Sequence, residues 1–256
     1  FKEGAMDLRV GADEVDVVVV RGVYSWISAA NQEFITDVIR RRLRPGGLAY
    51  VMYETATGWS SMAPLAEALR LYVDADGRRG DLAFHDAATA VLELRENGAM
   101  CFPLGPRESA MADQWSTANP AYAAHEYLGS NFVPLMVDEV FATMRHAKCT
   151  FVGSMGPLDH HPYYSMPSEL TDLVNSAADP VLAHFVRDLV VQRQLRRDLF
   201  RRGSVFATNH EQIAWLRGVR FGGLGKPFGP QPVELTAMQV TLDPTYHVPL
   251  VEALAT

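Results

Sequence analysis

The stretch that decides the fold is "VDVVVVRGVYSWISAANQEFITDVIRRRLRPGGLAYVMYETATGW", residues 15–59. The run of β-branched residues at 15–20 predicts a strand buried on both faces, as in a parallel sheet. Apolar residues at helical spacing predict a helix over 31–43, which Pro45-Gly46-Gly47 ends. A second apolar run predicts a strand at 48–53. Strand, helix and strand in this order predict a right-handed parallel crossover.

The rest of the chain reads mainly as helices. Helical patterns separated by Gly, Pro and Asn cover 60–75, 81–97, 107–115, 121–128, 137–147 and a long segment from 180 to about 202. Strands are predicted at 149–153 and 233–242. The fold class is therefore α/β, with a mostly helical insertion in the sheet. The predicted domains are a partial core at 1–59, a helical insertion at 60–147, a return to the sheet at 148–166, and a C-terminal helical and β region at 167–256.

Composition narrows the class of protein. The chain has 256 residues, a net charge of -7 and two cysteines without CxxC spacing, Cys101 and Cys149. The acidic balance argues against a dedicated nucleic-acid binder. The cysteine usage fits a reduced, cytoplasmic protein and indicates no disulfide framework or zinc site. No apolar run reaches the length of a membrane span.

Two aromatic-rich segments follow the two predicted strands. Residues 21–26 follow the first strand and residues 53–59 follow the second. Ligands of open parallel sheets bind beyond the carboxyl ends of the strands, so we expect both segments to line one site. For any single residue, ordinary packing under a loop explains the pattern equally well.

Several segments together resemble a known family. They are "RGVYSWIS", "RPGGLAYVMYETATGW", "YAAHEYLGSNFVPLMVDEVFATMRHAKCTFVGS" and "RRDLFRRG", which span most of residues 16–203. The set is similar to class I S-adenosylmethionine-dependent methyltransferases that carry a methyltransferase regulatory domain. That group includes bacterial protein-lysine methyltransferases. The resemblance implies the C-terminal half of a Rossmann-like methyltransferase sheet, with residues 1–8 at the end of the third strand.

The resemblance also implies roles for individual residues. It implies cofactor contacts from Arg21, Gly22, Val23 and Trp26, catalytic roles for Glu54, Tyr53 and Tyr24, and acceptor contacts from Trp59, His125, Glu126 and Tyr127. The cofactor implied is S-adenosyl-L-methionine, and the acceptor is a protein side chain, lysine first, or a small molecule. No metal, nucleic acid or membrane span is expected, and exposed helices in the insertion leave a homodimer open.

The sequence departs from the family pattern in two ways. Tyr53-Glu54 stands where the family tends to have Tyr-Asn, and Thr57-Gly58-Trp59 stands where it tends to have Pro-Gly-Trp. Glu54 either orients the acceptor or is a surface charge. The glycine-rich turn of the cofactor site is also missing before Val15. We therefore expect the chain to be the middle and later part of a longer polypeptide.

Other motifs have structural explanations or fail the test of spacing. His125-Glu126 can cap a helix, and Asp159-His160-His161 need not converge on a metal because neighbouring side chains diverge. The glycine-rich segment 222–229 does not have the spacing of a phosphate-binding loop. The alternative to an enzyme is a non-catalytic module that binds a partner through its helices. Another nucleotide-binding α/β enzyme is a weaker alternative, since no phosphate-cradling turn is present.

Overall fold

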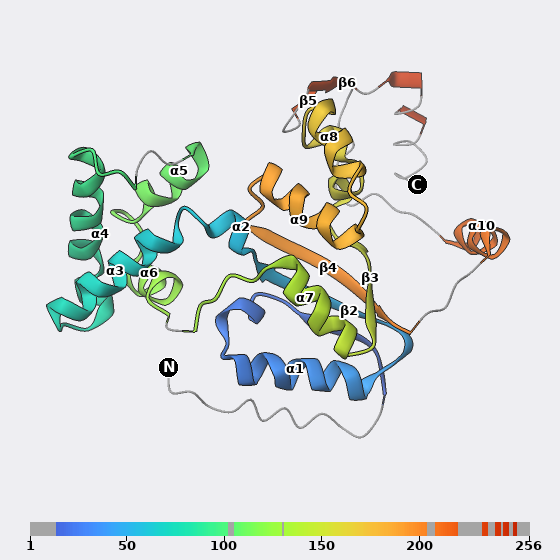
Figure 1. The fold of residues 1–256 in the computed structure, drawn as a ribbon, viewed down its shortest axis with the longest axis horizontal. Helices are drawn as coiled ribbons and strands as arrows, with labels where there is room; N and C mark the ends of the chain where they lie inside the picture. The colour runs from blue at the N-terminus through green and yellow to red at the C-terminus, as the bar shows by residue number, and fades with distance from the viewer. Residues whose placement is uncertain are drawn as a thin grey trace.

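A mixed four-stranded sheet forms the core of the computed structural model (Figure 1). The structure describes residues 14–101, 105–129, 131–203, 208–219, 232–234, 239–241, 243–245 and 248–249. The strands are β1 (Val15–Val20), β2 (Leu43–Glu54), β3 (Cys149–Ser154) and β4 (Leu195–Arg202), in the spatial order β1-β2-β4-β3. β1 and β2 are parallel, and β4 runs antiparallel to both β2 and β3.

The predicted crossover is present. Helix α1 (Ala29–Arg42) connects β1 to β2 and buries Ile35 and Ile39 against the sheet. It begins where the Ser28 hydroxyl accepts a hydrogen bond from the backbone N–H of Asn31 at 3.4 Å. The helix ends before Pro45-Gly46-Gly47, which lies in the first part of β2. A side chain at Gly47 would collide with the backbone oxygen of Asp16, so only glycine allows β1 to approach β2 here.

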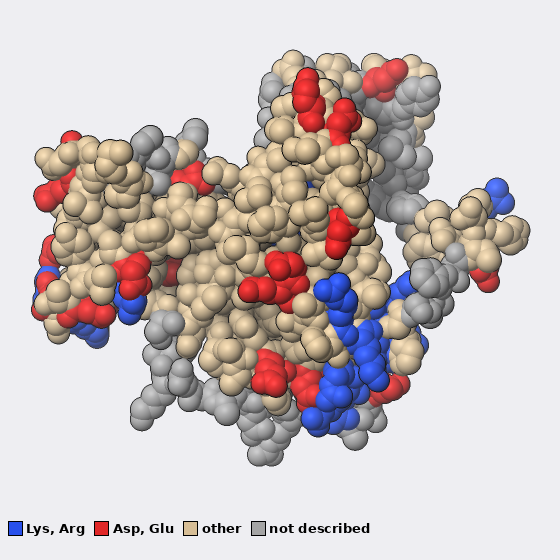
Figure 2. Space-filling view, viewed as in Figure 1, with Lys and Arg blue, Asp and Glu red and all other residues tan. Residues whose placement is uncertain are grey.

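One face of the sheet is covered by helices and carries the main core. Helices α1, α7 (Val137–His146) and α9 (Pro180–Val190) pack on this face. The core joins Val51 of β2, Phe200 of β4, and Phe141 and Met144 of α7. Figure 2 shows basic side chains gathered at the end of the molecule where α1 and α7 end, a placement that suits the helix dipoles.

The prediction that β1 is buried on both faces is wrong for the described part of the chain. Val17 and Val19 point away from the helices and are 54% and 63% exposed, and Val152 of β3 is also exposed. The apolar run reflects a strand suited to burial on both faces. Within the described residues only one of these faces is covered.

The prediction of one long helix from 180 to about 202 is also wrong for the second half of this segment. Helix α9 ends at Val190, and residues 195–202 form strand β4 in the middle of the sheet. Their charged residues resemble an exposed helix face, yet Arg196 and Asp198 lie with Phe200 on the buried face of the strand. β4 thus belongs to the core sheet, although the sequence places it in the C-terminal region. The domain boundaries themselves stay predictions.

A buried charge cluster allows β4 to occupy this central position. Arg196 donates from Nη1 to both oxygens of Asp188 on α9 at 2.9 Å and from Nε to Asp198 at 2.7 Å. The Tyr53 hydroxyl donates to the same Asp198 carboxylate at 2.9 Å. Each buried charge of the cluster therefore has a partner of opposite sign, which offsets the cost of removing it from water.

The helices predicted before α7 form a second lobe beside the sheet (Figure 1). It contains α2 (Ala56–Trp59), α3 (Ala63–Asp76), α4 (Gly80–Glu96), α5 (Pro106–Gln114) and α6 (Pro120–Tyr127). Its own core is built around Trp115, Phe84 and Leu69. No helix among the described residues has the length and apolar character needed to cross a membrane.

Shorter elements complete the described chain. They are η1 (Tyr24–Trp26), η2 (Pro157–His160), η3 (Pro162–Tyr164), α8 (Ser168–Asn175), α10 (Asn209–Gly218), β5 (Pro232–Glu234) and β6 (Gln239–Thr241). β5 and β6 pair antiparallel, so the single strand predicted at 233–242 is two short strands where it is described. Residues 1–8 and 222–229, which the sequence interpretation also singled out, lie outside the described residues.

The charge cluster gives a stability prediction. Arg196→Met removes the cation between two buried carboxylates, and we expect the free energy of unfolding to fall by about 3–5 kcal/mol. Arg197→Met, on the exposed side of the same strand, is the control and should change it by less than about 0.5 kcal/mol. Urea denaturation measures both. A loss below about 1 kcal/mol for Arg196→Met would mean that the cluster contributes little net stability.

Candidate functional site

The two aromatic-rich segments meet at the carboxyl ends of β1 and β2, as the sequence predicts. The Ser25 hydroxyl, in η1, accepts a hydrogen bond from the backbone N–H of Glu54 at 2.9 Å. Ser25 therefore joins the turn after β1 directly to the last residue of β2. The side chain of Glu54 lies on the face of the sheet opposite Tyr53, because neighbouring residues of a strand alternate.

A third segment crosses both strand ends. Residues 131–135, which we call the strap, run from the helical lobe toward α7 (Figure 1). The N–H of Val133 donates to the backbone oxygen of Ser25, and that of Leu135 donates to the backbone oxygen of Glu54, both at 2.9 Å. Leu135 also accepts from Ala56 N–H at 3.0 Å, within a parallel bridge to Thr55. The strap therefore holds the two segments together.

An aromatic row lies along the strap. The ring of Phe132 stacks on Trp26 with centroids 4.2 Å apart and meets the edge of Trp59 at 4.8 Å. The imidazole of His125 lies on Trp26 at 6.4 Å. Four elements thus contribute to one aromatic surface, namely the turn after β1, helix α2, helix α6 and the strap. Such a surface can stabilise a cation by about 0.5–2 kcal/mol per ring face.

Glu54 is the carboxylate of this surface. The indole Nε1 of Trp59 donates to Glu54 Oε2 at 3.0 Å. Burial raises the pKa of the Glu54 carboxyl, and the charge of Glu126 adds to the rise, while the Trp59 hydrogen bond opposes both. Burial also raises the pKa of Glu126. Two half-buried carboxylates beside aromatic rings form an environment that favours a cationic ligand.

The Thr57-Gly58-Trp59 turn is held by the backbone of Arg193, which lies just before β4. The Thr55 hydroxyl caps α2 by accepting from the N–H of Gly58 at 3.2 Å, and it donates to the backbone oxygen of Arg193. A side chain at Gly58 would overlap the backbone of Arg193. Only glycine therefore allows α2 to pack here and to bury Trp59 beneath Phe132.

Other residues that the sequence assigned to the site direct their functional groups elsewhere. The Tyr24 hydroxyl is 3.3 Å from the Thr36 hydroxyl on α1, and the Tyr53 hydroxyl is bonded to Asp198 on the helix-covered face. The ring of Tyr127 lies 6.1 Å from Phe84 in the lobe core. These hydroxyls and this ring are separate from the aromatic row. Their catalytic and acceptor roles stay predictions.

The residues expected to contact the cofactor surround a very small cavity. It has a volume of about 10 Å³ and is lined by Gly22, Val23, Ser25, Trp26, Met52, Tyr53, Glu54 and Leu195. Arg21 is exposed beside it, and Gly22 has a left-handed backbone (φ 68°) with open space around its Cα. A volume of this size holds about one water molecule. A larger, open hollow of about 870 Å³ lies along α1, and Tyr24 is the one predicted site residue that lines it.

Sequence reasoning did not single out Phe132 or the strap. Phe132 lies six residues after Glu126 in a loop without helical or strand periodicity. Its importance depends on the contacts with Trp26 and Trp59, which are distant in the sequence. Among the described residues, no group of three or more His, Cys, Asp or Glu side chains is arranged to hold a metal ion.

Comparison with known proteins agrees with this architecture. Residues 119–202, which include the strap, match the family model described as the predicted methyltransferase regulatory domain. The match confirms the resemblance on which the sequence interpretation rests.

Two curated relatives extend the similarity beyond this segment. The uncharacterized protein sll1526 of Synechocystis sp. is 29% identical over 209 residues, covering 81% of this chain and 41% of the relative. The uncharacterized protein RP028 of Rickettsia prowazekii is 29% identical over 126 residues, covering 48% of this chain and 50% of the relative. The chain therefore spans half or less of the length of these proteins.

Solved structures establish the fold. PKMT2 from Rickettsia typhi superimposes with a TM-score of 0.58, and PKMT2 in complex with AdoHcy superimposes with a TM-score of 0.61. In both cases the sequence identity is 21%, and the alignment covers 82% of this chain and 40% of PKMT2. The chain has a methyltransferase fold, as the sequence predicts.

The raised pKa of Glu54 gives a prediction about stability. The folded state holds the Glu54 proton more tightly than the unfolded state does, so ionisation costs stability as the pH rises through the folded pKa. Glu54→Gln keeps an acceptor for Trp59 and removes this cost. We expect the variant to unfold at an equal or higher temperature than the wild type at pH 7.

At a pH below the ordinary glutamate range both forms are neutral, and the difference in melting temperature should disappear. Glu33→Gln, at an exposed position on α1, is the control for a general charge effect. A Glu54→Gln variant that is less stable than the wild type at pH 7 would mean that the ionised carboxylate is stabilised in its site.

Proposed function

We propose that the protein to which this chain belongs is an S-adenosylmethionine-dependent methyltransferase that acts on an amine, most directly the side chain of a protein lysine. The observation that carries the proposal is the position of Glu54. This carboxylate lies at the carboxyl end of β2, bonded to Trp59 and beside the aromatic row. Aromatic faces and a carboxylate together suit an alkylammonium group.

The residues of the chain have distinct parts in this proposal. S-adenosylmethionine, when bound, supplies a methyl group carried on a sulfonium. Trp26 presents aromatic surface to the cationic groups, and Trp59, buried beneath Phe132, orients Glu54 through its indole N–H. Glu54 accepts a hydrogen bond from the acceptor ammonium and takes its proton, so that the nitrogen lone pair becomes free. A carboxylate with a raised pKa is suited to this transfer near neutral pH.

The residues present fit one end of the cofactor. The cavity between Gly22, Trp26 and Glu54 is too small for a nucleoside, at about 10 Å³. Its walls are the residues expected to meet the cofactor, and the open space at Gly22 leaves room for a ligand to approach from outside. These residues would contact the methyl-bearing end of S-adenosylmethionine and not its nucleoside.

The choice of acceptor rests on likeness rather than on a bound ligand. The likeness to PKMT2 and the regulatory-domain segment support a protein acceptor. Glu54 in place of the usual Asn adds a negative charge that favours an amine over a neutral hydroxyl. Both cysteines are free, which supports the cytoplasmic location that forms part of the proposal.

The test begins with the full-length protein. Calorimetric titration with S-adenosylmethionine should give one-to-one binding, and labelled methyl groups should then appear on lysines of protein substrates by mass spectrometry. Binding of the cofactor without methyl transfer to any amine would contradict the proposal that the acceptor is an amine. The absence of cofactor binding would contradict the proposal of an enzyme. It would favour the alternative of a non-catalytic module that binds a partner through its helices.

A pair of variants tests the role of Glu54. We expect Glu54→Gln to lower kcat about 100–10,000-fold with little change in cofactor affinity, because the proton acceptor is lost and the walls of the cavity remain. An equal loss of turnover and cofactor affinity would instead indicate a structural role.

Glu126→Gln is the variant matched to Glu54→Gln, and it tests whether Glu54 sets the pH dependence of activity. The charge of Glu126 raises the pKa of Glu54, so its removal should move the acid limb of the pH–activity profile to lower pH while leaving the maximal rate nearly unchanged. Profiles of kcat/KM between pH 5 and 9 measure the shift. An unmoved acid limb would show that Glu54 does not control it.

A further inference from the structure

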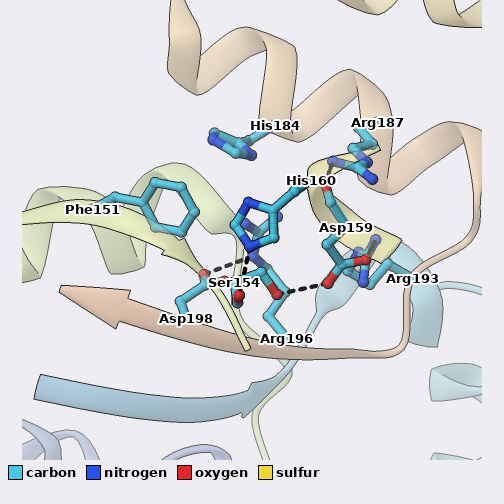
Figure 3. Close-up of a pocket in the computed structure, with 9 residues that line it drawn as sticks. All are labelled: Phe151, Ser154, Asp159, His160, His184, Arg187, Arg193, Arg196 and Asp198. Carbon is cyan, nitrogen blue, oxygen red and sulfur yellow. Dashed lines mark hydrogen bonds and ion pairs between the residues drawn. The ribbon is translucent and has the colours of Figure 1, made fainter. Parts of the chain in front are cut away.

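The two carboxylates of the candidate site are not neutralised in the way that the buried charges on the other face of the sheet are. Figure 3 shows those charges at a small cavity between the sheet and α9, where arginines lie against aspartates. Arg196, for example, pairs with Asp198 at 2.7 Å. Neither Glu54 nor Glu126 makes an ion pair with an arginine or lysine among the described residues. Two half-buried carboxylates therefore share one surface without a cation.

Glu126 lies where three effects oppose a negative charge. Burial raises the pKa of its carboxyl, and the charge of His125 only opposes that rise. Glu126 also lies in the last turn of α6, where the negative end of the helix dipole disfavours an anion. Besides burial, the charge of Glu126 raises the pKa of Glu54, so the two carboxylates repel each other. A residue selected for stability alone would be neutral or basic here.

The end of α6 gives Glu126 no structural task. The N–H of Leu128 donates to the backbone oxygen of Ala124 at 3.0 Å and closes the helix. The Asn119 side chain caps the other end by accepting from the N–H of Ala121 at 3.0 Å. The Glu126 carboxylate makes no hydrogen bond within the described part of the chain. The helix cap that the sequence allowed for this carboxylate is therefore not made.

The helical lobe supplies no cation to Glu126. Residues 56–128 contain no lysine. The arginines of the lobe whose side chains are described pair with other carboxylates, namely Arg70, Arg78, Arg79 and Arg95 with Glu67, Asp76, Asp81 and Asp113 in that order. A cationic group of a bound ligand would supply the missing counter-charge.

Tyr122 extends the same surface by one helical turn. It lies four residues before Glu126 on the same side of α6, and it is 62% exposed. The charge of Glu126, followed by slight burial, raises the pKa of the Tyr122 hydroxyl. The carboxylate of Glu126 therefore acts on both Glu54 and Tyr122. An exposed aromatic ring beside a carboxylate suits a guanidinium or ammonium group.

We propose that Glu126 and Tyr122 form a second cation-binding subsite beside Glu54, which receives an arginine or lysine side chain next to the acceptor lysine. The acceptor is then a basic segment of a polypeptide. Its second cation donates to the Glu126 carboxylate and lies against the Tyr122 ring. Glu126 selects the acceptor and takes no proton from it. This inference rests on the proposed function, because Glu54 defines where the acceptor nitrogen lies.

A matched set of peptides gives the first test. Each peptide contains one lysine and carries either arginine or citrulline, which is similar in shape but uncharged, at one of the two positions on either side of the lysine. With the full-length protein, calorimetry should show about 10-fold tighter binding of the arginine peptide at one or more positions, roughly the effect of one hydrogen bond between charged groups. Equal affinities at all four positions would overturn the proposal.

Variants of the subsite give the second test. Glu126→Gln should abolish the preference for arginine over citrulline and raise KM for the arginine peptide rather than lower kcat. Tyr122→Leu should weaken the preference about 3-fold, since one ring face is lost. Glu93→Gln, at an exposed position on α4 of the same lobe, is the control and should keep the full preference. A preference that survives Glu126→Gln would assign the cation to another residue and contradict the subsite.

The binding measurement separates this inference from the proposed function, because it does not require methyl transfer. Methylation of arginine and citrulline peptides with equal kcat/KM would support the methyltransferase and overturn the subsite. A preference for arginine in binding that Glu126→Gln removes, without methylation of any peptide, would support the subsite and contradict the methyltransferase.

Discussion

The position of β4 between β2 and β3 depends on the neutralisation of Arg196 inside the protein. Its guanidinium lies between Asp188 of α9 and Asp198 of its own strand, and the Tyr53 hydroxyl completes the group. If Arg196 were missing, the Asp198 carboxylate would stay buried without its ion-pair partner, and this would destabilise the strand that joins the two halves of the sheet. The same cluster fixes the end of β2, from which Glu54 extends on the opposite face.

The candidate site is assembled across that sheet edge by the strap. Hydrogen bonds from Val133 and Leu135 connect the ends of the β1 and β2 segments, and Phe132 fills the space between Trp26 and Trp59. The strap lies in the segment that matches the methyltransferase regulatory domain. The regulatory segment is therefore part of the wall of the site, and a change in the packing of the helical lobe would reach Trp26 and Trp59 directly.

The sequence predicted much of the local structure, because local structure has a local signal. The apolar spacing in α1 and the β-branched run of β1 are visible in one window of the chain. The expectation that the Trp26 and Trp59 segments meet follows from the general rule for strand ends in parallel sheets. β4 was missed because its charged residues look like a solvated helix face until Asp188 is known to lie opposite Arg196.

By itself, the sequence determined the crossover of β1, α1 and β2, the α/β class, and the two segments that bound the site. Only the tertiary structure decided that Phe132 joins these segments, that Glu126 lies close enough to affect Glu54, and that Arg187 of α9 donates to the backbone oxygen of Asp159. Periodicity reports which face of an element is buried, and this information is contained in neighbouring residues. The partners of a charge or a ring are chosen by contacts between distant residues, and those exist only once the chain has folded.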